Sequence, residues 1–102
     1  MENNGLTNKN RALFIELVLS MSSMAMQQLG KTINPLNGKI EKNIKLAKAT
    51  LDMIFMLKEK TQNNLSIQEQ DIINVTLSNL QLNYMEELDK LKKQADIKEE
   101  KR

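Results

Sequence analysis

The chain contains neither cysteine nor histidine. Without cysteine there can be no disulfides, thiolate nucleophiles or cysteine-ligated zinc and iron–sulfur sites. Without histidine the chain lacks the commonest general base and the commonest metal ligand. Any catalysis would have to rest on carboxylates, lysines, hydroxyls or the single tyrosine. We therefore expect no catalytic residue, no metal site and no cofactor.

Residues that build sheets and turns are also scarce. Among 102 residues there are one proline, three glycines, two phenylalanines and no tryptophan. A β-sandwich or barrel would need aromatic and β-branched residues at regular spacing. Leucine, lysine, glutamate, glutamine, alanine and methionine dominate the middle of the chain, and all of them favour helix. The composition predicts one all-α domain.

No stretch is apolar enough to cross a bilayer. The most apolar run, residues 13–26, is interrupted by Glu16, Ser20, Ser22 and Ser23, so it is too short and too polar to span. The first residues lack the basic region and apolar stretch of a signal peptide. We expect a cytoplasmic protein.

Turn signals divide the chain into three helices. Gly30 directly after Leu29 suits the left-handed position that ends a helix. Asn34-Pro35 and Asn37-Gly38 mark a loop. The predicted helices cover residues 9–29, 39–62 and 67–93, which form a single domain at residues 9–93 between a frayed N-terminus at residues 1–8 and a charged tail at residues 94–102. This pattern predicts a three-helix antiparallel bundle, or a helical hairpin plus a helix, that self-association completes.

The second predicted corner, "TQNNLSIQE" at residues 61–69, carries helix-end signals on both sides. Asn63 can adopt the left-handed conformation, and Leu65 can fold back onto the helix it leaves, as in a Schellman ending. Ser66 and Glu69 have the spacing of a capping box. Asn64 lies between the two signals. We interpret the corner as structural rather than chemical.

Apolar residues predict an interface between copies. The first and second predicted helices are apolar nearly all round, and three helices cannot bury both completely. The third carries a single apolar stripe, which consists of Ile73, Leu77, Leu80, Tyr84, Leu88 and Leu91. Unmatched apolar faces mark interfaces, most simply of a twofold dimer. The alternative is that these faces only fill a wide monomeric core, with the methionines as gap fillers. The predicted interface consists of Phe14, Val18, Met21, Met24, Ala25, Leu46, Met53, Met56 and Leu57.

A polar strip on the second predicted helix has two interpretations. Its members are Lys48, Asp52, Glu59 and Lys60. With Asn64 reaching in, they could form a small polar site. Alternatively, Lys48 and Asp52 form an ordinary ion pair of neighbouring turns, and Lys60 stabilises the end of the helix. The second interpretation explains the spacing more simply.

Nucleic-acid and membrane binding are weakly supported. Lys39, Lys42, Lys45 and Lys48 recur every three residues, so they spiral around a helix instead of forming a stripe. The net charge is only +2, and few aromatic residues could stack on bases. The polar side of the first predicted helix lacks the lysines and arginines of a membrane-surface helix. We expect a non-enzymatic, homo-oligomeric interaction module; the alternatives are a nucleic-acid or membrane-surface accessory protein, and an enzyme using carboxylates and lysine.

The middle of the chain resembles a known family. The residues that carry the resemblance are Ser20 to Ala25, Leu29-Gly30, Asn34-Pro35, Gly38, Ala47-Lys48, Leu51-Asp52, Leu57, Glu59-Lys60-Thr61 and Asn64-Leu65-Ser66. Over residues 13–86 the chain resembles the small bacterial family called domain of unknown function 1844. Asn63, Met24 and Gln81 depart from the family's pattern, which usually has glycine, glutamine and arginine there. The resemblance implies a helical, cytoplasmic protein and no reaction.

Overall fold

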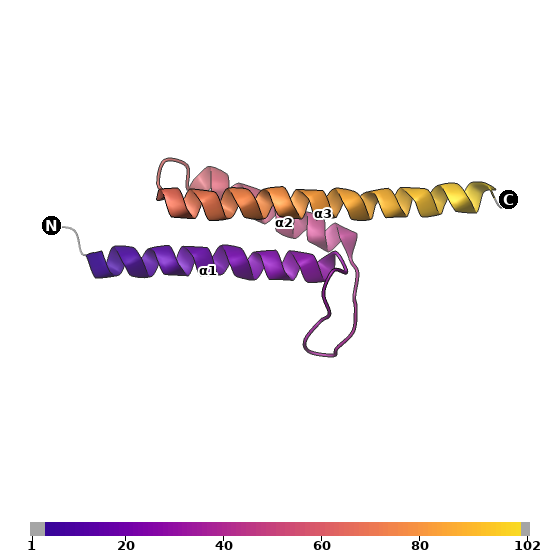
Figure 1. The fold of residues 1–102 in the computed structure, drawn as a ribbon, viewed down its shortest axis with the longest axis horizontal. Coiled ribbons are helices and arrows are strands. Elements are labelled where there is room, and N and C mark those ends of the chain that lie inside the picture. Colours follow the sequence, from indigo (N-terminus) through magenta and orange to yellow (C-terminus); the bar gives the residue numbers. More distant parts are fainter. Residues whose placement is uncertain (1–3, 101–102) are drawn as a thin grey trace.

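A computed structural model describes residues 4–100, which form three helices packed against one another. They are α1 (Asn4–Gln28), α2 (Ile44–Lys60) and α3 (Ile67–Glu100). The chain runs up, down and up, so that α2 is antiparallel to both α1 and α3 (Figure 1). Within the described part the only β-structure is one isolated bridge, between Asn34 and Lys39. The predicted all-α class and packed helical bundle are confirmed.

The core lies where one side of each helix meets the other two. The predicted stripe of α3 begins in this core, because Ile73, Leu77 and Leu80 are buried. Leu91 is exposed, since α3 continues well past the ends of α1 and α2 (Figure 1). The buried apolar cluster contains Val18, Ala25, Leu51, Ile54, Ile73, Leu77 and Leu80.

The helix ends differ from the prediction by more than two residues in three places. α1 already begins at Asn4, α2 begins at Ile44 instead of residue 39, and α3 runs on to Glu100. The later start of α2 has a clear cause, because Asn43 is its N-cap and accepts a 3.0 Å hydrogen bond from the backbone N–H of Leu46. The longer α3 follows from helix-forming residues in the charged tail. Residues 1–3 and 101–102, which belong to the predicted N-terminus and tail, lie outside the described residues.

Gly30 ends α1 as predicted. Its φ of +78° is left-handed, and the N–H groups of Lys31 and Gly30 donate to the carbonyls of Met26 and Gln27 at 2.9 and 3.0 Å. These two bonds define a Schellman ending. A Cβ on residue 30 would also lie 3.3 Å from the Cβ of Lys42. The position therefore requires glycine for its backbone conformation and also for space.

The loop between α1 and α2 is held by its own hydrogen bonds. The N–H of Asn34 donates to the carbonyl of Lys39 at 2.7 Å. The side-chain amides of Asn34 and Asn37 both donate to the Glu41 carboxylate, at 2.6 and 3.1 Å. The hydrogen bond from Asn34, with a smaller effect from Asn37, lowers the pKa of Glu41. These bonds keep residues 39–43 out of the helix, although their composition permits helix.

The corner between α2 and α3 confirms the predicted left-handed asparagine. Asn63 has φ +68°, and Leu65 packs against the core cluster. The predicted Schellman ending is replaced by a turn in which the N–H of Asn64 donates to the carbonyl of Thr61 at 2.9 Å. The reason is position: Thr61 is the C-cap, so Asn63 lies one residue too far along the chain for that motif.

Ser66 and Glu69 form the predicted capping box. The N–H of Glu69 donates to Ser66 Oγ at 3.2 Å, and the N–H of Ser66 donates to Glu69 Oε1 at 2.8 Å. Two N–H groups that would otherwise lack a partner are satisfied this way. The corner thus begins α3 within a few residues of the end of α2.

Removing the cap should weaken the fold measurably. We expect Ser66→Ala to lower the free energy of unfolding by about 0.5–2 kcal/mol, because a free N–H loses its acceptor. Asn63→Gly should be neutral or mildly stabilising, and Asn63→Val should destabilise, since a β-branched residue resists a positive φ. Urea denaturation followed by circular dichroism measures all three. The control is Ser78→Ala on the exposed side of α3; equal effects for Ser66→Ala and Ser78→Ala would refute the capping assignment.

Candidate functional site

The predicted polar strip lies on open surface. Lys48 Nζ and Asp52 Oδ1 are 2.6 Å apart, and both side chains are about half exposed. The hydrogen bond to Asp52 raises the pKa of Lys48. Glu59 and Lys60 are exposed on the following turns. The arrangement matches an ordinary surface ion pair, and the acidic residues of the described part of the chain form no group able to hold a metal ion.

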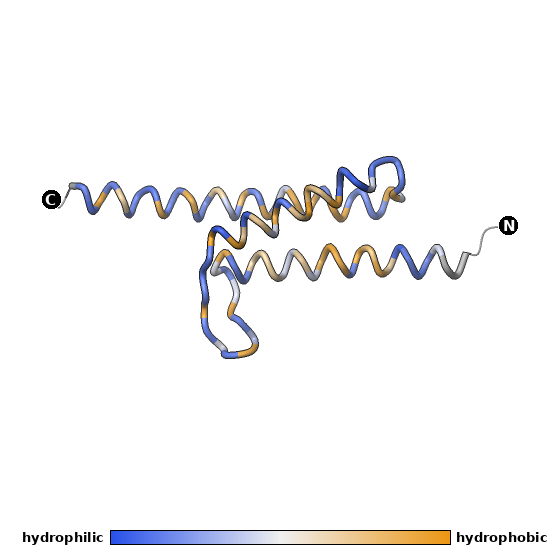
Figure 2. Tube along the Cα trace, turned by 180° about the vertical axis from the view of Figure 1, so that it is seen from behind, coloured by the Kyte–Doolittle hydropathy of each residue, from blue (hydrophilic) through white to orange (hydrophobic). Residues whose placement is uncertain are grey.

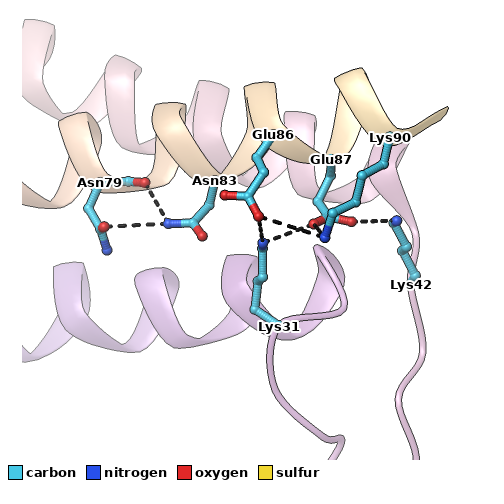
Figure 3. A network of polar contacts seen from close by, with 7 residues as sticks. All are labelled: Lys31, Lys42, Asn79, Asn83, Glu86, Glu87 and Lys90. Atoms are coloured by element: carbon cyan, nitrogen blue, oxygen red, sulfur yellow. Dashed lines mark hydrogen bonds and ion pairs between the residues drawn. The ribbon is translucent and has the colours of Figure 1, made fainter. Parts of the chain in front are cut away.

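A different charged cluster lies at the end of the bundle where α1 ends and α2 begins (Figure 3). Its centre is Glu87, whose side chain is only 4% exposed. The Glu87 carboxylate pairs with Lys31 at 2.9 Å, with Lys90 at 3.0 Å and with Lys42. Lys31 also bonds Glu86 at 2.8 Å. The cluster joins both ends of the loop between α1 and α2 to α3.

Three lysines offset the cost of burying this carboxylate. Burial alone would disfavour its charged form. Instead, hydrogen bonds from Lys42, Lys31 and Lys90, in that order of effect, lower the pKa of Glu87 to about 2. The carboxylate therefore stays charged at neutral pH, and the cluster fastens the loop in place.

Sequence reasoning missed Glu87 because it followed only apolar residues. The signal was present, since Leu80, Tyr84, Glu87 and Leu91 alternate in steps of four and three along one side of α3. A charged residue at such a position must find partners or leave the core. Its partners Lys31 and Lys42 come from a distant loop, so their identity was not readable from the spacing.

A buried polar contact joins α1 to α2. Thr50 Oγ1 donates to Gln28 Oε1 at 2.7 Å, and both residues are buried. The backbone carbonyl of Gln28 also accepts from the N–H of Asn43 at 2.7 Å. This contact fixes which sides of the two helices face each other.

The predicted interface requires a correction at two residues. Val18 and Ala25 are fully buried in the core of the three-helix bundle, so they are unavailable to a partner. They were assigned wrongly because nearly all of α1 is apolar, and only packing decides which side turns inward. Phe14, Met21 and Leu57 are partly buried and pack against the same core.

The other predicted interface residues are exposed. Met24, Leu46, Met53 and Met56 each keep about half of their surface accessible. Leu13 and Leu17 of α1 are exposed to the same degree and were missing from the predicted set. We call these six residues the α1–α2 face: Leu13, Leu17, Met24, Leu46, Met53 and Met56.

Comparisons with known proteins identify a family but no reaction. None of the helices formed by residues 4–100 is long and apolar enough to cross a membrane. No curated protein and no solved structure matches the chain. The family described as a domain of unknown function (DUF1844) matches residues 11–86. Since this match covers most of the chain, from the first half of α1 to the middle of α3, the protein belongs to the DUF1844 family.

Proposed function

We propose that the protein is a non-enzymatic helical interaction module that works as a homo-oligomer, most simply a dimer. The observation that carries this proposal is surface area. The subunit exposes 7708 Å², whereas a compact monomer of 11.7 kDa exposes about 5,900 Å². A chain with this much surplus surface can bury more of it by associating.

The shape and the distribution of apolar residues support the same proposal. The radius of gyration is 17.3 Å, against about 13 Å for a compact domain of this length. Figure 2 shows hydrophobic colour along much of α1, while the free end of α3 is mainly hydrophilic. The surplus surface is therefore partly the charged end of α3 and partly apolar surface on α1 and α2. The apolar part is the part that gains from a partner.

The alternative functions gain no specific observation. Of the four lysines that suggested nucleic acid, Lys42 pairs with Glu87 and Lys48 pairs with Asp52. Those two positive charges are already matched within the subunit, which leaves Lys39 and Lys45 for a phosphate backbone. The exposed Lys48–Asp52 pair likewise offers an enzyme no enclosed site. The cytoplasmic location and the bacterial origin stay predictions.

Self-association should appear directly in the molecular mass. Sedimentation equilibrium over a wide range of protein concentration should give about twice the 11.7 kDa of one chain, and the mass should fall towards one chain on dilution. Neutral pH and physiological salt are suitable conditions, because an apolar contact depends little on ionic strength. A mass of one chain at every concentration up to the millimolar range would refute the proposed function.

A further inference from the structure

We propose that the α1–α2 face is the docking surface for a second copy of this chain, in a twofold arrangement in which α1 and α2 of both copies pack together. This inference rests on the proposed self-association and assigns it to one surface. The side of each copy that α1 and α2 form would then contact the same side of the other copy. The α3 helix of each copy would lie on the outside of the dimer.

The Gln28–Thr50 hydrogen bond places the two halves of this face side by side. Successive residues turn by about 100° around a helix. On α1, Leu17 and Met24 lie immediately outside Gln28, on the side away from the core. On α2, Leu46 and Met53 likewise lie next to Thr50 around the helix, on the side away from the core. The apolar residues of the two helices therefore lie on either side of the line where α1 and α2 meet, and they form one continuous surface.

The seam between α1 and α3 is lined differently. Asn79 and Asn83 of α3 lie on the side that faces α1, and the Asn83 amide donates to the Asn79 carbonyl at 2.8 Å (Figure 3). Nearby, Lys31 pairs with Glu86 across the same seam. Amides and charges at an interface core would have to lose water without gaining equivalent partners, which disfavours this side for docking.

The seam between α2 and α3 is also polar. The side of α2 that lies opposite Thr50 carries Lys48, Asp52 and Glu59. This side of α2 borders α3, because α1 packs against the side that carries Thr50. The seam between α1 and α2, in contrast, exposes apolar residues on both helices, at Leu17 and Met24 and at Leu46 and Met53.

The middle of the face carries no charge, which favours a second copy as the occupant. A twofold interface pairs a surface with itself, so any charge near the axis meets the same charge. Within the described part of α1 the charged residues are Lys9, Arg11 and Glu16, and none of them lies on the side of the helix between Leu17 and Met24. The side of α2 between Leu46 and Met53 carries no charged residue either. On α2, Lys60 follows Leu46 and Met53 at the same spacing of seven residues, and on α1 Lys9 lies one turn before Leu13, so both charges stand at one end of the face. A twofold axis through the middle of the face, near Leu17 and Met53, therefore brings no like charges together. The three methionines on the face can adapt their side chains to such a contact.

The area also fits one interface of ordinary size. The subunit exceeds the surface of a compact monomer by about 1,800 Å². A standard interface removes about 800 Å² from each partner. One twofold contact on the α1–α2 face therefore fits within the surplus.

A charge placed on the face should break the dimer. We expect Met53→Glu and Leu17→Glu to weaken dimerisation at least 100-fold in sedimentation experiments, because each copy would bury an unpaired carboxylate. The matched controls are Val75→Glu and Leu82→Glu, which change exposed apolar residues on the outer side of α3 and should leave the dimer unchanged. If Leu82→Glu dissociates the dimer and Met53→Glu does not, the face is wrong while self-association stands. If the wild type is a monomer, both proposals fail.

A second measurement covers the case in which a glutamate variant does not fold. Since the chain has no cysteine, Met53→Cys and Leu82→Cys each introduce a single reporter thiol. Labelling of Met53→Cys by a maleimide should be at least tenfold slower at high protein concentration than after dilution below the dissociation constant. Labelling of Leu82→Cys should be the same at both concentrations. Equal rates for Met53→Cys at the two concentrations in a protein that sediments as a dimer would overturn the assignment of the face.

Discussion

Leu80→Ala is expected to lower the free energy of unfolding by about 2–5 kcal/mol, whereas Leu82→Ala should change it by less than about 0.5 kcal/mol. The two leucines lie on the same helix, two positions apart, but their exposures are 1% and 71%. Truncating Leu80 leaves a cavity among Val18, Ile54 and Leu77. Truncating Leu82 removes methyl groups that water already surrounds. The pair therefore separates core packing from helix propensity, because both positions undergo the same chemical change.

The loss expected for Leu80→Ala is a large part of the protein's total free energy of unfolding. Domains of this size are stable by about 5–15 kcal/mol, and each kcal/mol shifts the midpoint of thermal unfolding by about 4–8 °C. We expect a drop of at least about 10 °C for Leu80→Ala. The measurement needs a fixed protein concentration, because association also raises the midpoint. Similar drops for both variants would mean that α3 is not packed on α1 and α2 as described.

Acid should loosen the fold through Glu87. Its pKa is about 2 in the folded protein and 4.5 ordinarily. A carboxylate with a lowered pKa contributes stability that is fully present above its unfolded pKa. This stability is lost as the pH falls from about 4.5 to about 2. If the whole pKa difference between the folded and unfolded states contributed to folding, it would add about 3 kcal/mol to the free energy of unfolding. Because Lys42 and Lys90 reach solvent and water screens them, we expect roughly half of that value.

Glu87→Gln tests this contribution directly. The variant keeps the shape of the side chain but loses the charge that Lys31 and Lys42 face. At pH 7 it should be roughly 1–2 kcal/mol less stable than the wild type, and this deficit should shrink as the pH approaches 2. Urea denaturation at a series of pH values measures both effects. Glu99→Gln, on the exposed end of α3, is the control and should follow the wild type.

Two further carboxylates have pKa values that are shifted in the same direction as that of Glu87. Lys31, chiefly through its hydrogen bond, lowers the pKa of Glu86, and Asn34 does the same for Glu41. Both groups are exposed, so they add little to the acid sensitivity. A residual loss of stability below pH 4.5 in Glu87→Gln is therefore expected to be small. If the variant loses as much stability in acid as the wild type, another group must account for the effect.

The sequence alone was sufficient for the helix ends that depend on neighbouring residues. Gly30, Asn63 and the pair Ser66 and Glu69 adopt the conformations that their types and spacing predicted. These features were readable because an end of a helix is satisfied by hydrogen bonds within a few residues. The start of α2 was not readable, because the hydrogen bonds of Asn34 and Asn37 within the preceding loop keep residues 39–43 out of the helix.

The sequence also determined that α1 and α2 carry more apolar surface than three helices can bury. Which part of that surface turns inward was decided only by the tertiary structure, which buries Val18 and Ala25 and leaves Met24 and Met53 exposed. The same holds for Glu87, whose charge is held by lysines from a loop far away in the chain. The physical reason is common to both. Burial and charge stabilisation depend on which segments meet in space, and a helix that is apolar nearly all round has several orientations that local preferences cannot distinguish.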